Sequence, residues 1–202
     1  MSIIEALILG LIQGLTEFLP VSSSGHLIIG KELLGIEASE SVAFEVVVHA
    51  ATVCTTITVL WLEIWQLLRG VLKFKWNEEM QYACKIAISM IPVMLVGLFL
   101  KDWVEALFGE GVLLVGIMLL ITALLLALTH FVRFAERHSI GYGSALVVGL
   151  AQAVAVLPGL SRSGSTIATG LLLGIKREEM AKFSFLMVLI PILGEADRKS
   201  VV

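Results

Sequence analysis

Uncharged apolar stretches divide this chain into segments of the length that a lipid bilayer requires. A helix needs about 20 mostly apolar residues to cross the hydrocarbon core. Residues 46–62 and 111–132 contain no Asp, Glu, Lys or Arg. A third stretch, which we place over 83–100, contains Lys85 near its start and ends before Lys101, and both long side chains can reach the membrane surface. The pattern predicts three membrane-spanning helices.

Two other apolar regions are interrupted near their middle. Residues 6–30 are broken at Glu17 and Pro20 and then continue as a run of serines. A similar interruption, Pro158–Gly159, divides the region 140–161 and its continuation. Irregular backbone at membrane depth is tolerated only where protein or a water-filled cavity satisfies its polar groups. We therefore expect each region to form a broken, re-entrant helix pair.

The two broken regions are copies of one another. With a shift of 139 residues, positions 10–44 align without a gap with 149–183 and are identical at 13 of 35 positions. We take 3–62 as the first copy and 142–196 as the second. The identical pairs around the breaks include Gly10 with Gly149, Gln13 with Gln152, Ser22 with Ser161, Ser24 with Ser163 and Gly25 with Gly164.

The number of spans between the copies predicts their relative direction. If each copy enters and leaves on one side, three intervening spans place the second copy on the opposite face of the membrane. The predicted fold is therefore an all-α, polytopic membrane protein with an inverted-topology repeat, in one integral domain over 1–196. Folds of this kind place their site near the midplane, where the broken helices converge.

Composition supports the membrane assignment and excludes two other classes. Hydrophobic residues make up 58% of the chain and charged residues 15%, with a mean hydropathy of +0.98. A soluble domain has roughly 45–50% and 25%, so a soluble enzyme is excluded. The net charge of -3, with no basic cluster, argues against nucleic-acid binding.

Lysines and arginines gather on one side of the predicted topology. By the positive-inside rule this side is cytoplasmic, so the N-terminus and the first re-entrant loop face outward. The other side shows Lys31 and Lys101. The cytoplasmic set is Arg69, Lys73, Lys75, Arg133, Arg137, Lys176, Arg177 and Lys182.

The copies differ where chemistry would take place. The first copy has Glu17, Ser23 and His26, and the matching positions of the second hold Val156, Arg162 and Ser165. An ionisable residue in membrane-embedded backbone is costly and indicates function by default. One copy thus contributes an acid and an imidazole and the other a guanidinium, which predicts a single composite site.

The residue types at the breaks suit a phosphate group. A Ser- and Gly-rich break that opens a helix presents backbone N–H groups to an anion, and Arg162 adds a bidentate fork. Any single serine could instead satisfy the freed backbone. The nucleophile stays open between Ser22, Ser23 and His26; we favour a serine with His26 as its base, because His26 follows Ser22 by four residues and Ser23 by three. The expected phosphate-binding residues are Gly25, Ser161, Ser163, Gly164 and Thr166.

These motifs resemble a known family. The stretches QGLTEFLPVSSSGH (13–26) and PGLSRSGST (158–166) resemble the two signature motifs of the bacitracin-resistance type undecaprenyl-diphosphate phosphatases, and the likeness includes FEVVVHAAT (44–52) and FSFLMVLIP (183–191). The resemblance implies a bacterial plasma-membrane enzyme of cell-wall lipid recycling. It would remove the terminal phosphate of undecaprenyl diphosphate with the help of a divalent cation, and so give bacitracin resistance.

The resemblance also implies roles for single residues. Gln13 and Glu17 fall on the family's metal positions, for Mg²⁺ or Ca²⁺, although many members have Glu where this chain has Gln13. The serine and histidine positions of the first motif are Ser22, Ser23 and His26. Arg162 belongs to the second motif, together with Ser161 and Thr166.

Two other classes of function stay as alternatives. A secondary transporter or a polyprenyl-phosphate translocator would use the same inverted repeat and the same binding groups, but it needs no nucleophile. A scaffold protein would leave Glu17, His26 and Arg162 without a role. The expected partners are the lipid substrate and membrane lipids, with a homo-oligomer left open.

The length of the chain gives one more expectation. The family normally runs well past 250 residues, whereas this chain stops at Val202. Its last six residues, 197–202 (DRKSVV), are also what a common sequencing adapter encodes when it is read in frame. We therefore expect a truncated gene product with a non-native tail over 197–202.

Overall fold

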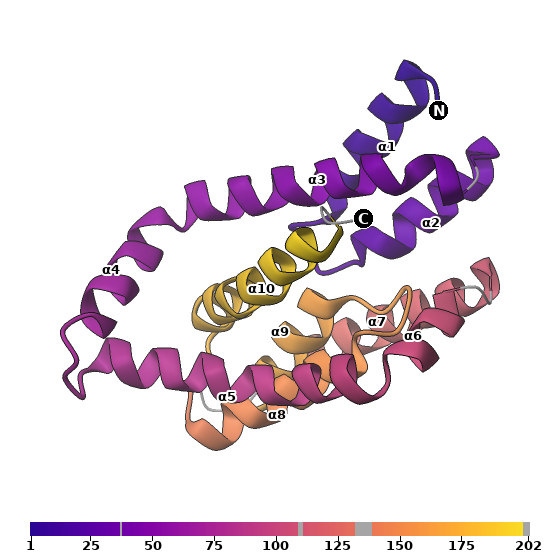
Figure 1. The fold of residues 1–202 in the computed structure, drawn as a ribbon. Helices are drawn as coiled ribbons and strands as arrows, with labels where there is room; N and C mark the ends of the chain where they lie inside the picture. Colours follow the sequence, from indigo (N-terminus) through magenta and orange to yellow (C-terminus); the bar gives the residue numbers. More distant parts are fainter. Residues whose placement is uncertain (37, 109–110, 132–138, 200–202) are drawn as a thin grey trace.

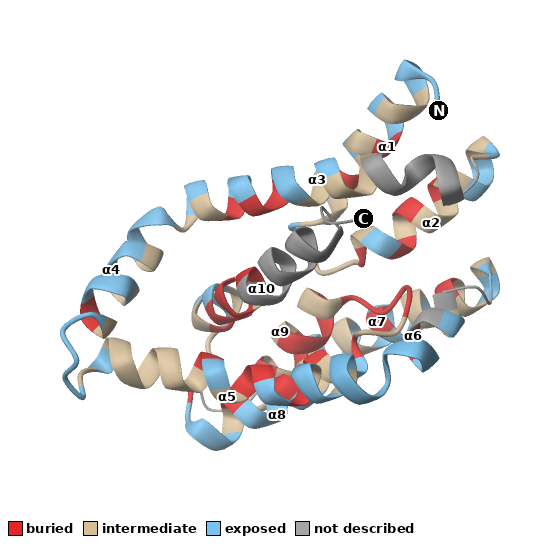
Figure 2. Ribbon diagram, in the orientation of Figure 1, coloured by how far each residue is buried: buried red, intermediate tan, exposed pale blue. Residues whose placement is uncertain are grey.

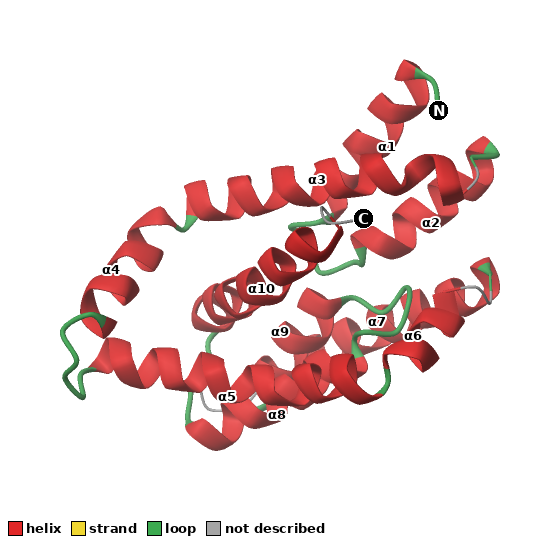
Figure 3. Cartoon of the chain, viewed as in Figure 1, coloured by secondary structure: helices red, strands yellow, loops and turns green. Residues whose placement is uncertain are grey.

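The computed structural model describes residues 1–36, 38–108, 111–131 and 139–199, and every regular element in these ranges is a helix (Figures 1 and 3). The expected all-α fold is confirmed. The expected tail lies partly on the last helix, and 200–202 fall outside the described residues, as do Arg133 and Arg137. The helices are α1 (Ile3–Thr16), α2 (Ser23–Leu34), α3 (Ala38–Val59), α4 (Trp61–Val71), α5 (Glu78–Phe99), α6 (Lys101–Phe108), α7 (Val112–Phe131), α8 (Tyr142–Val154), α9 (Arg162–Leu172) and α10 (Arg177–Lys199).

The repeat extends over three helices. Helices α1, α2 and α3 begin at Ile3, Ser23 and Ala38, and the same shift of 139 residues gives the starts of α8, α9 and α10. In Figure 1, α3 runs from its indigo end beside α2 towards α4, whereas α10 runs the opposite way, towards the C-terminus. The two helices pack against each other. The copies are therefore inverted relative to one another.

The two breaks touch through a reciprocal pair of contacts. A Cβ atom on Gly25 would lie 3.2 Å from the Cα of Gly159, and a Cβ on Gly164 would lie 2.7 Å from the carbonyl oxygen of Pro20. The shift of 139 residues converts Gly25 into Gly164 and Pro20 into Gly159. The shift therefore converts the partners of one contact into the partners of the other, which is the relation that a two-fold axis produces. A local pseudo-two-fold axis thus passes between the breaks.

Among the residues that the structure describes, two helices are long and apolar enough to cross a membrane alone. They are α5 and α7, on which the expected spans 83–100 and 111–132 lie. Helices α1 and α8 have 14 and 13 residues, and a rise of about 1.5 Å per residue makes each roughly 20 Å long, less than the hydrocarbon core. Both are therefore too short to span, as re-entrant segments should be.

The expected span over 46–62 is not one continuous helix. Helix α3 ends at Val59, and the chain bends by 74° into α4. Glu63 of α4 forms an ion pair with Lys182 of α10, at 3.7 Å. The opposite side of α4 carries Trp61 stacked on Trp65. The ion pair therefore ties α4 to α10, and among the described residues the bent α3–α4 pair is the candidate for a third span.

The core lies around α10 and the α5–α8 pair, where Figure 2 shows most of the buried residues. Phe183, Met180 and Met187 of α10 are fully buried. Helix α8 approaches α5 closely at Gly149, where a Cβ would lie 2.3 Å from the carbonyl oxygen of Ser89. This packing holds the second broken pair rigidly against a membrane-spanning helix.

Candidate active site

The first break runs from Glu17, which caps the C-terminus of α1, to Ser22, which caps the N-terminus of α2. Ser22 has φ 67°, in the left-handed region that a residue with a side chain rarely adopts. Its Oγ accepts a hydrogen bond from the N–H of Gly25, at 3.3 Å. Strained residues of this kind cluster at functional sites, where the surroundings hold them in place.

Glu17 is the centre of a hydrogen-bond network. Its Oε2 accepts one hydrogen bond from Gln13 Nε2, at 2.8 Å, and another from Ser23 Oγ. Gln13 is buried, and its Oε1 has no hydrogen-bond partner. The expected pair of Gln13 and Glu17 is thus brought together, with the Ser23 hydroxyl directly on the carboxylate.

His26 lies one turn into α2. Its Nδ1 is 2.8 Å from the backbone carbonyl oxygen of Ser22. A carbonyl can only accept, so this contact assigns the proton to Nδ1 and leaves Nε2 as the basic nitrogen of the neutral ring. The hydrogen bonds therefore join Ser23 to Glu17 and His26 to the Ser22 backbone, whereas the sequence favoured His26 as the partner of the nucleophilic serine.

The second break mirrors the first at its cap. Ser161 Oγ accepts a hydrogen bond from Gly164 N–H, at 3.0 Å, and Ser161 is 1% exposed. The backbone N–H of Ser161 in turn donates to Thr122 Oγ1, at 3.0 Å. Arg162 is the first residue of α9 and is half-buried. It therefore starts from the break that touches the first break at Pro20.

Some expected phosphate contacts are already engaged within the protein. The N–H groups of Gly25 and Gly164 both donate to cap serines. Thr166 is fully buried, and its hydroxyl lies 2.9 Å from the carbonyl oxygen of Arg162 and 2.7 Å from Ser184 Oγ. In this structure Thr166 joins α9 to α10, and its contact with an anion stays a prediction.

The structure adds two residues that sequence reasoning missed. Thr122 supports the second cap, and Ser184 bonds Thr166 from α10. Thr122 is the first hydroxyl of the apolar helix α7, and Ser184 interrupts an apolar run at the start of α10. A lone polar residue in such a run is a usable signal, but it does not identify the partner.

The residues around Glu17 fit a divalent cation as partial ligands. Carboxylate and amide oxygens are the donors that Mg²⁺ and Ca²⁺ prefer, and the unpartnered Oε1 of Gln13 is such an oxygen. Within the described residues no group of three or more His, Cys, Asp or Glu side chains could hold a metal alone. Phosphate oxygens and water would complete the coordination, as is usual for Mg²⁺.

Comparison with known proteins gives consistent relatives. An undecaprenyl-diphosphatase of Bacteroides thetaiotaomicron is 58% identical over 201 residues, which cover 100% of this chain and 76% of the relative. One of Bacteroides fragilis is 60% identical over 192 residues, covering 95% and 72%. One of Methanosphaera stadtmanae is 40% identical over 217 aligned residues, covering 96% and 75%.

The likeness is also found at the level of the family. The family described as bacitracin resistance protein BacA matches residues 6–200. Together with the apolar helices, this match makes the chain a multi-pass membrane protein. With its two broken helix pairs and its serine-rich caps, the chain belongs to the bacitracin resistance protein BacA family.

Proposed function

We propose that this chain hydrolyses undecaprenyl diphosphate, releasing its terminal phosphate and leaving undecaprenyl phosphate. The relatives are named for this activity. The observation that carries the proposal is the hydrogen bond from Ser23 Oγ to the Glu17 carboxylate. The Ser23 hydroxyl can act as the nucleophile, and the Glu17 carboxylate that it bonds can act as its base. Arg162 comes from the second break, which contacts the first. Nucleophile, base and phosphate-binding group are the three parts that phosphoryl transfer needs.

The reaction follows from these positions. Ser23 Oγ attacks the terminal phosphorus and passes its proton to Glu17, while the bond from that phosphorus to the bridging oxygen breaks. Arg162 binds the non-bridging oxygens through its fork, where negative charge concentrates. Water then attacks the phosphorus of the phosphoserine, with His26 Nε2 taking its proton. The bond from the phosphorus to Ser23 Oγ breaks, Glu17 returns its proton to Ser23 Oγ, and inorganic phosphate leaves. A cation held by Glu17 and Gln13 would neutralise part of the charge on the diphosphate.

The test measures phosphate released from undecaprenyl diphosphate by the purified protein in detergent with Mg²⁺. Ser23→Ala should reduce release to background, and the wild type should give an acid-stable phosphoenzyme. The exposed Ser24 is the matched control, and Ser24→Ala should stay within about threefold of the wild type. Full activity in Ser23→Ala would remove this nucleophile, and an acid-labile adduct that is lost in His26→Ala would assign the role to His26.

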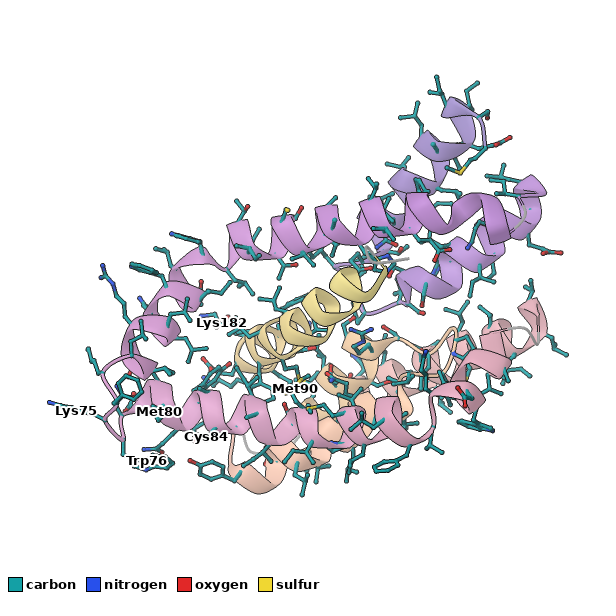
Figure 4. The ribbon with its side chains drawn as sticks, in the orientation of Figure 1. Lys75, Trp76, Met80, Cys84, Met90 and Lys182 are labelled. Carbon is teal, nitrogen blue, oxygen red and sulfur yellow. The ribbon has the colours of Figure 1, made fainter. Side chains whose placement is uncertain are left out.

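The proposed location is the bacterial inner membrane, with the N-terminus outside. Lys75 and Trp76 project from the connection between α4 and α5 (Figure 4). The α9–α10 connection, with Lys176, lies towards the same end of the molecule (Figure 1). The positive-inside rule then makes this end cytoplasmic.

The pseudo-two-fold contact between the breaks also suits a translocator that moves a polyprenyl phosphate across the membrane. The same assay separates the two functions. Movement of a labelled lipid in vesicles, without any release of phosphate, would favour the translocator.

A further inference from the structure

Helix α7 lies outside the repeat, yet one of its faces contacts both breaks. Val115, Leu119 and Thr122 are spaced four and three residues apart, so they share one face. A Cβ on Gly25 of the first copy would lie 3.3 Å from Leu119 Cδ2. A Cβ on Gly159 of the second copy would lie 2.7 Å from the carbonyl oxygen of Val115. This face of α7 is therefore the common support of the two breaks.

Thr122 is the polar member of this face. Its Oγ1 donates to the carbonyl oxygen of Met118 and accepts from the N–H of Ser161, both at 3.0 Å. Its side chain is 2% exposed, and the residues around it in α7 are apolar. A threonine hydroxyl has one proton and two lone pairs, so both hydrogen bonds can form at once.

The second cap needs this bond because its own sequence cannot supply it. The N–H of an N-cap residue is commonly bound by the side chain three residues later. Helix α1 does so, since Glu5 accepts from the N–H of Ser2 at 2.7 Å. In α9 the residue three after Ser161 is Gly164, which has no side chain. Thr122, 39 residues before Ser161, takes the place of the missing partner.

We propose that Thr122 is a positioning residue for the phosphate-binding break, a role that rests on the proposed function. It touches neither substrate nor cation. Its hydroxyl fixes the backbone of Ser161, and the next residue, Arg162, extends its guanidinium from that backbone. Loss of the hydroxyl leaves a buried N–H without an acceptor, so the break shifts until that N–H finds another partner. Arg162 then meets the transferring phosphoryl group less well.

The test compares Thr122→Val, which keeps the shape but removes the hydroxyl, with Thr122→Ser, which keeps the hydroxyl. The matched control is Thr129→Val. Thr129 lies on the same helix and is half-buried, and its hydroxyl donates to a carbonyl of its own helix, that of Leu126 at 2.7 Å, rather than to a break. Four quantities are measured: kcat/KM for undecaprenyl diphosphate, the inhibition constant of orthovanadate, the affinity for inorganic pyrophosphate by calorimetry, and the melting temperature.

We expect Thr122→Val to lower kcat/KM about tenfold or more and to raise the vanadate constant and the pyrophosphate Kd by a similar factor, because the buried N–H of Ser161 is left without an acceptor and the backbone that carries Arg162 shifts. Thr122→Ser and Thr129→Val should stay within about twofold of the wild type. Wild-type vanadate and pyrophosphate binding in folded Thr122→Val would overturn the proposal, even if its melting temperature falls.

The proposed function can fail separately. If the wild type binds pyrophosphate but releases no phosphate from the lipid, hydrolysis is refuted and the pyrophosphate Kd still tests Thr122. A folded wild type that neither hydrolyses the lipid nor binds pyrophosphate would overturn both.

Discussion

The substitution Gly164→Ala should separate the two breaks. Its added Cβ would lie 2.7 Å from the Pro20 carbonyl oxygen and 2.9 Å from Ser161 Oγ. Both neighbours belong to the caps and breaks themselves, so relief requires backbone movement. Overpacking of this kind costs about 1–3 kcal/mol. Alanine has a better helix propensity than glycine, which raises the free energy of unfolding by up to about 1 kcal/mol. The net loss in unfolding free energy should therefore be about 0–2 kcal/mol.

The effect on catalysis should be larger than the effect on stability. A displacement of about 1 Å in a positioning group can cost about 100-fold in rate, so we expect kcat/KM for Gly164→Ala to fall at least tenfold. The assay is phosphate release at a temperature where thermal unfolding shows the variant to be folded.

The matched control is Gly14→Ala. Nothing lies within 4 Å of a Cβ on Gly14, and the second copy already has Ala153 at this position. This variant should keep its activity and be slightly stabilised, by up to about 1 kcal/mol. If Gly164→Ala were as active as Gly14→Ala, the close contact between the breaks would have no bearing on the reaction.

Three further predictions concern the phosphate-binding group, the cation and the topology. Arg162→Lys keeps the charge but loses the planar fork, so turnover should fall on the order of 100-fold, and near-wild-type kinetics would take Arg162 out of the site. Chelation with EDTA should abolish phosphate release, and Mg²⁺ or Ca²⁺ should restore it; an EDTA-insensitive rate would contradict a cation at Glu17. Gln13→Ala, which leaves the Glu17 carboxylate in place as the base, should need more cation for half-maximal rate. With the two native cysteines replaced, an impermeant thiol reagent should label Glu32→Cys of the first copy from outside and Lys176→Cys of the second copy only after permeabilisation, and labelling of both from one side would contradict the inverted topology.

The repeat made much of the fold predictable. Because the copies share glycines and serines at the breaks, the sequence alone placed Ser22 and Ser161 at equivalent positions, and both are N-caps. Their backbones differ, since Ser161 has φ -71° while Ser22 is left-handed. The left-handed conformation of Ser22 is imposed by neighbours in space, so the local sequence does not predict it.

Contacts between distant segments account for what the sequence did not reveal. The bend after Val59 follows an uncharged run that gives no sign of a break, and the ion pair from Glu63 to Lys182 of α10 is visible only in the folded chain. Thr122 lies 39 residues from its partner Ser161. The residues that carry the chemistry could be predicted because they are concentrated in two short motifs. The residues that hold them in place, such as Thr122 and Ser184, are scattered along the chain and could not.

The reciprocal contact between the breaks explains how the site can differ between the two faces of the membrane. Two identical chains inserted in opposite orientations would make this same self-complementary contact. Such a dimer would present identical residues to both faces of the membrane, and a reaction at its centre would have no preferred direction of access. Here the exchange of Glu17, Ser23 and His26 for Val156, Arg162 and Ser165 breaks that equivalence. The divergence of a few residues at a nearly symmetrical junction is enough to let a membrane enzyme distinguish inside from outside.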